Sequence, residues 1–150
     1  TGWRLGWLIV PAGVRDELSE LIEVTHSGVA PFIQQAGLAA IADHVTPPSF
    51  RAHCAAGRRI AADMLGQVPG IRYASPDGAF YAFLQVEGLT DSLHLAERLV
   101  VDHGIAVAPG IAFGESGEGW LRLCFAVAPA RLGRALTRLA EGLTAFRRSA

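Results

Sequence analysis

Residues 109–127 read Pro-Gly-Ile-Ala-Phe-Gly-Glu-Ser-Gly-Glu-Gly-Trp-Leu-Arg-Leu-Cys-Phe-Ala-Val. The glycine-rich first part predicts a loop, and the apolar second part predicts a strand over Leu121–Val127. In that strand Arg122 alternates with Leu121 and Leu123 and therefore lies on the opposite face from them. A single guanidinium in an otherwise apolar strand is costly unless it meets an anion. The stretch therefore predicts a strand that carries one arginine in need of an anionic partner.

Two kinds of anion could meet Arg122. One is a side chain of the protein such as Glu87, Glu115 or Glu118. The residues around the strand, taken without other context, favour this buried salt bridge. The other is the carboxylate of a ligand, because an arginine fork can bind both carboxylate oxygens at once.

The C-terminal part of the chain alternates helices with strands. Asp91 can cap one of the helices and Gly104 can end it. Aromatic residues alternate along the strand at 78–86, and for most of them we expect a place in the core. The expected helices are Phe50–Val68, 91–103 and Ala130–Arg148, and the expected strands are Gly78–Val86, Ile105–Ala108 and Leu121–Val127.

The N-terminal part has a different order. Leu5–Val10 is a short apolar run bounded by glycine and proline, which predicts a buried strand. Two helices follow, the second over about Phe32–Asp43. Thr46-Pro47-Pro48-Ser49 interrupts the pattern, because its prolines stop one helix and its serine can cap the next. We therefore expect an α/β chain in two parts, residues 1–46 and 47–150.

Arg4 lies at the entrance to the first apolar run, within Gly2-Trp3-Arg4-Leu5-Gly6-Trp7. A guanidinium there must be paired or lie at an opening, because burying it unpaired is costly. One interpretation is an edge arginine stacked on Trp3 or Trp7 in a cation–π contact. The other is an anion site, since a bidentate fork suits a phosphate better than an ammonium group does.

These segments resemble the class I/II, fold-type I aminotransferases that depend on pyridoxal 5'-phosphate, in particular the members similar to aspartate aminotransferase. In that family a Gly-Trp-Arg-x-Gly-Trp/Tyr segment grips the cofactor phosphate, and Gly2–Trp7 matches it at every defined position. A Pro-Gly…Phe-Gly…Arg array, matched by residues 109–122, binds the substrate α-carboxylate. The family's Gly-Ala-Phe-Tyr strand, which borders the active-site mouth, is matched at 78–81 by residues that include Phe80 and Tyr81. The resemblance therefore implies that Arg4 binds the cofactor phosphate and Arg122 the substrate carboxylate.

The resemblance also implies which part of the fold is present. Residues 1–46 would be the end of the large cofactor-binding α/β domain, and residues 47–150 would be the small C-terminal α/β domain. The family holds its cofactor as a Schiff base to a lysine ahead of the first motif, and this chain contains no lysine. We therefore assign no catalytic residue here, expect the lysine upstream of Thr1, and expect the chain alone to be inactive.

The activity implied is the transfer of an amino group between an amino acid and a 2-oxo acid, by a homodimer. The same scaffold carries amino-acid decarboxylases, carbon–sulfur lyases and cyclising enzymes, so these stay open as alternatives. An aminotransferase-like sensory domain of a transcriptional regulator and a free-standing structural module also stay open. Many members reach the partner's cofactor from a Ser/Thr-Ser-Asn-Pro segment. Thr25-His26-Ser27 lacks the Asn-Pro pair, so the roles of these residues stay undecided.

Composition argues against several other classes of protein. Hydrophobic residues make up 51% of the chain, yet no apolar run approaches the ~18 residues of a membrane span. The net charge is −1 with scattered arginines, which is no nucleic-acid footprint. The five histidines show no metal-ligand spacing, and the cysteines Cys54 and Cys124 suit a reducing compartment. We therefore expect a cytoplasmic protein that has no signal peptide and binds no membrane, nucleic acid or metal.

Overall fold

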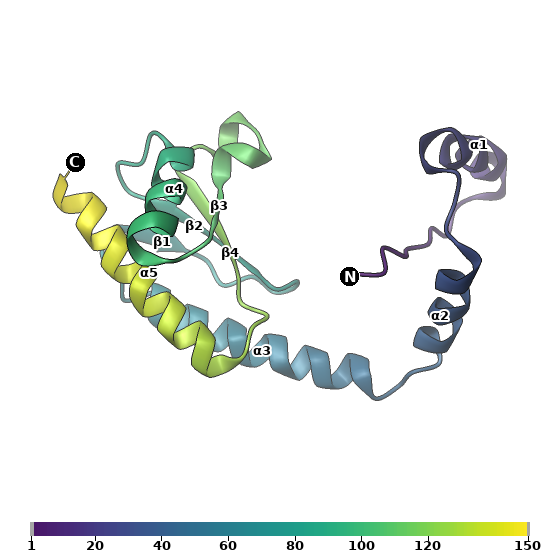
Figure 1. Cartoon of the computed structure of the whole chain (residues 1–150), viewed down its shortest axis with the longest axis horizontal. Coiled ribbons are helices and arrows are strands. Elements are labelled where there is room, and N and C mark those ends of the chain that lie inside the picture. The colour runs from purple at the N-terminus through teal and green to yellow at the C-terminus, as the bar shows by residue number, and fades with distance from the viewer. Residues whose placement is uncertain (1, 150) are drawn as a thin grey trace. The chain divides into compact units, whose positions relative to one another are not determined.

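The computed structural model describes residues 2–149, and the chain divides into two compact units, Thr1–Pro48 and Ser49–Ala150 (Figure 1). Both helices and strands are present, which confirms the expected α/β class. The assignment of residues 1–46 to a large domain and 47–150 to a small domain stays a prediction. Every helix within residues 2–149 is too short or too polar to traverse a lipid bilayer.

The first unit is built from helices and an extended N-terminal segment. It contains a 3-10 turn, η1 (Ala12–Val14), followed by α1 (Arg15–His26) and α2 (Pro31–Ile41). The strand predicted over Leu5–Val10 is wrong, because this segment pairs with no strand among residues 2–149. A strand needs hydrogen bonds from a neighbouring strand. Without one, Leu8 and Ile9 are 73% and 94% exposed.

One close contact holds the extended segment against a helix. The Leu5 side chain packs on Gly37 of α2, and a Cβ atom at Gly37 would overlap it. Gly37 is the one buried residue of α2. The apolar stripe of α1 is largely open, since Leu21 and Ile22 are 54% and 40% exposed. The first unit therefore buries little apolar surface of its own.

Helix α3 (Thr46–Leu65) begins four residues before the predicted start at Phe50. The two prolines lie in its first turn, where the missing N–H groups would have no helical partner in any case. The Asp43 Oδ1 atom accepts hydrogen bonds from the backbone N–H groups of Val45 (2.8 Å) and Thr46 (3.0 Å). The predicted break between the helices is present, but α2 ends before the prolines, at Ile41, and α3 contains them. The prediction that Ser49 caps the next helix is wrong, because Ser49 lies inside α3 and Asp43 accepts the N–H groups ahead of it.

The second unit contains one four-stranded antiparallel sheet. Its strands are β1 (Ile71–Tyr73), β2 (Tyr81–Val86), β3 (Ala108–Pro109) and β4 (Trp120–Cys124), in the order β1-β2-β4-β3. Strands β2 and β4 are shorter than predicted. Strand β3 shares only Ala108 with the strand predicted over Ile105–Ala108, and β1 was not predicted. Only three residues of β1 pair with β2, which leaves too short a run for periodicity to be visible in the sequence.

Three helices cover one face of this sheet (Figure 1). They are α3, α4 (Ser92–His103) and α5 (Pro129–Ser149). Asp91 accepts a hydrogen bond from the His94 N–H at 2.9 Å, and Gly104 ends α4 with a φ of 63°, so both predicted ends of this helix are confirmed. The core between helices and sheet includes the fully buried side chains Leu65, Leu84, Leu99, Leu121, Phe125, Leu132, Leu139 and Leu143.

Candidate functional site

The sheet of the second unit leaves its other face open, and Arg122 lies on that face. In β4 the side chains of Leu121 and Leu123 are buried while Arg122 is half-buried, which confirms the predicted alternation. Arg122 stands opposite Phe83 of β2 and Ala108 of β3. It is therefore flanked on both sides by paired strands, so its backbone position is fixed.

Aromatic rings surround the guanidinium of Arg122. Its carbon atom Cζ lies 4.4 Å from the centre of the Tyr81 ring and 4.2 Å from the centre of the Phe113 ring. Phe113 meets Phe83 edge-on at 5.9 Å, and Phe83 stacks on Trp120 at 5.0 Å. Rings at these distances attract a cation and exclude water from it.

The protein-acid alternative for Arg122 is wrong within residues 2–149. Glu87 pairs instead with Arg147 at 3.5 Å. The Glu118 carboxylate accepts hydrogen bonds from Ser92 and Gly119. No described residue forms an ion pair or side-chain hydrogen bond with Arg122. Its N–H donors are therefore open to solvent or to a ligand, and the planar fork suits a carboxylate.

Two of the residues beside Arg122 were misjudged from the sequence. Tyr81 and Phe83 are each 37% exposed on the open face, so the core place expected for most aromatic residues of this strand does not hold for these two. Phe113 is 46% exposed and was treated only as part of a motif. The signal that could have placed the strand residues is the period of two in β2, where the buried residues are the alternating Ala82, Leu84 and Val86.

Arg4 lies in the first unit, beside an open cavity. Its backbone φ is 53°, a left-handed conformation that residues other than glycine adopt at some cost. The cavity has a volume of about 810 Å³ and is lined by residues of the N-terminal segment and of both helices, among them Trp7 and Gln34. Trp3 and Trp7 are 63% and 68% exposed, and neither forms a cation–π contact with Arg4 within residues 2–149. The stacked-edge interpretation of Arg4 is therefore wrong.

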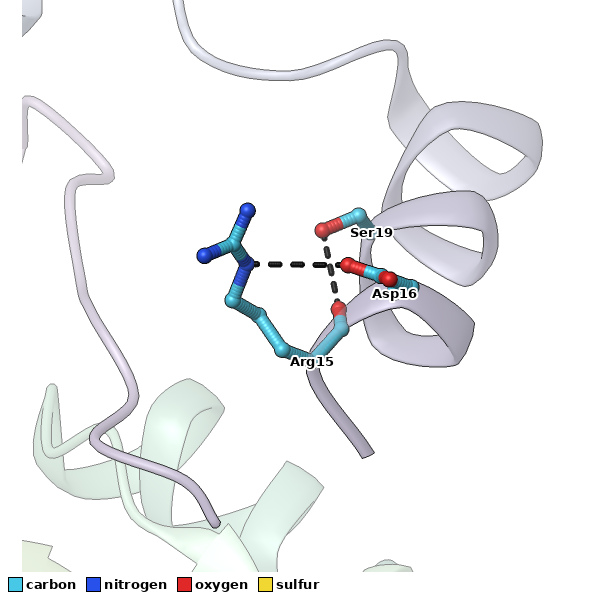
Figure 2. Close-up of polar contacts among 3 residues, drawn as sticks. All are labelled: Arg15, Asp16 and Ser19. Atoms are coloured by element: carbon cyan, nitrogen blue, oxygen red, sulfur yellow. Dashed lines mark hydrogen bonds and ion pairs between the residues drawn. The ribbon is translucent and has the colours of Figure 1, made fainter. Parts of the chain in front are cut away.

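A second arginine of the same cavity wall has a partner. The Arg15 Nε atom lies 3.6 Å from a carboxylate oxygen of Asp16, and the Ser19 hydroxyl donates to the Arg15 carbonyl oxygen at 2.9 Å. Both contacts are drawn as dashed lines in Figure 2. Arg4 has no such acid among the described residues. Of these two cations, Arg4 is therefore the better candidate for an external anion such as a phosphate.

The hydroxyl-bearing residues at the end of α1 contact their own helix. The Thr25 hydroxyl donates to the Leu21 carbonyl oxygen at 2.6 Å, and the Ser27 hydroxyl donates to that of Glu23 at 3.5 Å. Ser27 has a φ of 59° and ends the helix in the left-handed conformation. These bonds give Thr25 and Ser27 a structural role, and their role at a partner's site stays undecided.

Sequence comparison finds curated relatives across nearly the whole length of the chain. The sequence is 33% identical to the aspartate aminotransferase of Pyrococcus horikoshii, in an alignment that covers 95% of this chain and 38% of the relative. It is 34% identical to the valine–pyruvate aminotransferase of Mycobacterium tuberculosis, again with 95% of this chain and 38% of the relative covered. The chain thus spans well under half the length of the curated relatives it matches.

Comparison with solved structures also finds aminotransferases, and again the chain aligns with only part of each. The crystal structure of an aromatic aminotransferase from Pyrococcus horikoshii aligns with 98% of this chain and 40% of its own, at a TM-score of 0.83 and 30% identity. The crystal structure of an aminotransferase from Mycobacterium tuberculosis aligns with 96% of this chain and 38% of its own, at a TM-score of 0.82 and 34% identity. The sequence profile of the aminotransferase class I and II family matches residues 1–139, so the chain belongs to this family.

Proposed function

We propose that this chain is the part of a pyridoxal-phosphate-dependent aminotransferase that binds the substrate carboxylate and the cofactor phosphate. The reaction would transfer an amino group between an amino acid and a 2-oxo acid. The observation that carries the proposal is Arg122, a half-buried guanidinium between two rings with no acid partner among residues 2–149. Leaving such a group without an anion is costly, and a substrate α-carboxylate would remove that cost.

The described residues fit one part of the cofactor. Arg4 is exposed beside the cavity of the first unit and has no acid partner there, so it would hold the phosphate. When bound, the cofactor supplies the electron sink for bond breaking at the substrate α-carbon. Covalent attachment requires a lysine, and the 150 residues contain none. We therefore expect this chain by itself to catalyse no transamination.

Within this proposal Arg122 acts by binding and orienting the substrate. A bidentate grip on the carboxylate fixes the α-carbon relative to the sheet, because β4 holds the backbone of Arg122 between two neighbouring strands. Tyr81 and Phe113 exclude water from the guanidinium and so strengthen its attraction for a carboxylate.

The test is Arg122→Lys in the full-length protein that carries this chain. The lysine keeps the charge but loses the fork, so we expect KM for the amino acid to rise about 10- to 100-fold, the loss of a charge-assisted hydrogen bond. The matched control is Arg134→Lys, an exposed arginine on α5, which we expect to leave KM unchanged.

The product distinguishes the reaction classes. Formation of a 2-oxo acid with stoichiometric amination of the acceptor supports transamination. Release of carbon dioxide or sulfide instead would show that the scaffold carries a decarboxylase or a carbon–sulfur lyase, and the proposal of an aminotransferase would fall. An unchanged KM in Arg122→Lys would remove the assigned role of that residue.

We also propose that the full-length protein is a cytoplasmic homodimer. The first unit exposes large apolar side chains, such as Val24 at 80% and Phe32 at 67%, which suits contact with further protein. Both cysteines, Cys54 and Cys124, are free thiols, which suits a reducing compartment. Light scattering on the full-length protein checks the assembly, and a monomeric mass at micromolar concentration would contradict it.

A further inference from the structure

The carboxylate of Glu118 is bound by the backbone and a hydroxyl. Its Oε1 atom accepts hydrogen bonds from the N–H groups of Ser92 at 2.7 Å and Gly119 at 2.9 Å. Its Oε2 atom accepts a hydrogen bond from the Ser92 hydroxyl at 3.2 Å. No cation among residues 2–149 forms an ion pair with it. A carboxylate bound in this way fixes the segments that supply its donors.

Ser92 connects this carboxylate to a third segment. It is the first residue of α4 and its side chain is fully buried. Its hydroxyl oxygen accepts a hydrogen bond from the Ile111 N–H at 3.2 Å, while the same hydroxyl donates a hydrogen bond to Glu118. Ile111 belongs to η2 (Gly110–Phe113), the 3-10 turn that ends with Phe113. A single hydroxyl therefore connects Glu118 to the turn that carries Phe113.

The same turn is fixed from its other side. The backbones of Gly110 and Gly117 touch, and a Cβ atom on either would overlap the carbonyl oxygen of the other. Gly117 closes the next turn, η3 (Glu115–Gly117), directly before Glu118. The loop is therefore held by a close backbone contact and by the hydrogen bonds of one carboxylate.

These bonds hold the segments on both sides of the contact between Phe113 and Arg122. Phe113 is 46% exposed, so the core does not hold it against the guanidinium of Arg122. Glu118 itself lies directly before Gly119 and β4, the strand that carries Arg122. We propose that Glu118, acting through Ser92, is a positioning residue that holds Phe113 against Arg122 and so orients the guanidinium for a carboxylate.

The physical basis is preorganisation. A free arginine side chain samples many rotamers, and binding a ligand must restrict them. A ring fixed on the guanidinium restricts them beforehand, which raises affinity without a new contact to the ligand. The role of Arg122 towards a ligand rests on the proposed function, whereas the link from Glu118 to Phe113 does not.

The experiment uses two variants that disturb the same bond. In Glu118→Gln the amide oxygen can still accept from both backbone N–H groups, but the amide nitrogen can only donate to the Ser92 oxygen, so this hydrogen bond loses its charge and reverses its direction. In Ser92→Ala the hydroxyl is lost and both backbone bonds to Glu118 remain. The matched control is Glu115→Gln, which removes the same charge from the same loop.

The first measurement is the Nε–H resonance of Arg122 in NMR spectra of the 150-residue chain, assigned by its loss in Arg122→Lys. Because the rings of Phe113 and Tyr81 lie 4.2 and 4.4 Å from the guanidinium carbon, we expect them to shift this resonance away from those of the other arginines. We expect it to move back towards them in Glu118→Gln and Ser92→Ala, and to stay in place in Glu115→Gln. Phe113→Leu gives the full size of the shift due to that ring. An unmoved resonance in both test variants would overturn the proposal.

The second measurement is a titration with pyruvate, followed at the same resonance. We expect the dissociation constant to rise at least about threefold in the two test variants, because the guanidinium is no longer preorganised. Equal pyruvate affinity in wild type and both variants would overturn the orienting role. If pyruvate leaves wild-type Arg122 unaffected while the resonance moves in the variants, the proposed function fails and the link from Glu118 to Phe113 stands.

Discussion

Arg4 and Arg122 both lie among aromatic and apolar residues, yet their surroundings differ. Arg122 is held in a paired strand, with rings at 4.2 and 4.4 Å from its guanidinium carbon. Arg4 lies in an extended segment with no strand partner among residues 2–149, beside two largely exposed tryptophans. The second unit therefore contains the elements that place its arginine. The first unit contains Arg4 and the cavity beside it, but few buried side chains that would fix the position of Arg4.

The largest expected effect concerns packing. Leu84 of β2 is fully buried, whereas Leu8 of the N-terminal segment is 73% exposed. We expect Leu84→Ala to lower the free energy of unfolding by about 2–5 kcal/mol, the usual cost of a core leucine. Leu8→Ala serves as the matched control and should change it by less than about 0.5 kcal/mol. Urea unfolding of the 150-residue chain measures both, and equal effects would show that the N-terminal segment is packed after all.

The next prediction separates the two arginines by function. In the full-length protein, Arg4→Lys should weaken cofactor retention about 10- to 100-fold, since a phosphate loses the arginine fork. Arg15→Lys is the control, because Arg15 already faces Asp16. Cofactor release is followed by absorbance during dialysis. Loss of substrate affinity with normal cofactor retention in Arg4→Lys would contradict the assignment.

A smaller effect is expected at the start of α4. Asp91 accepts a hydrogen bond from the His94 N–H, so Asp91→Ala should lower the free energy of unfolding by about 1 kcal/mol. Asp91→Asn keeps an oxygen acceptor and should retain most of that stability. A loss in Asp91→Asn as large as in Asp91→Ala would show that charge rather than capping is responsible.

The sequence was most informative where a residue's role depends on its chain neighbours. The cap at Asp91, the end of α4 at Gly104 and the alternation around Arg122 are local, and all three are confirmed. The strand at Leu5–Val10 depends on a partner strand that residues 2–149 do not contain, so apolar content alone was misleading. The family assignment came from two spaced motifs, each of which combines several residue types.

The site was harder to foresee, because its contacts join segments far apart in the chain. Ser92 and Glu118 are 26 residues apart, and Ser92 and Ile111 are 19 apart. No local pattern marks such a connection. Glu118 was considered only as a salt-bridge partner of Arg122, whereas its actual donors are backbone N–H groups and a hydroxyl. Sequence distance hides this kind of contact, and a helix start such as that of α4 supplies the donors for it.

The smallest expected effect is a pH dependence that involves one carboxylate from each unit. Hydrogen bonds from the Gly119 N–H and from Ser92 hold the pKa of Glu118 below its ordinary 4.5, although burial and the nearby Asp91 oppose this. Hydrogen bonds from Thr46 and Val45 likewise hold the pKa of Asp43 below its ordinary 3.8. At acidic pH the unfolded chain therefore binds more protons than the folded one at both groups.

Stability from a lowered carboxyl pKa is fully present above the ordinary pKa and is lost as the pH falls through the folded value. We therefore expect the urea midpoint to be steady from pH 7 to about 5 and to fall below pH 4.5. Glu118→Gln should remove the share of this fall in the urea midpoint that comes from Glu118, and Asp43→Asn should remove the share that comes from Asp43. Because Asp43 and Glu118 lie in different units and share no partner, the two changes should add. A double variant with the full acid sensitivity of the wild type would show that other carboxylates control it.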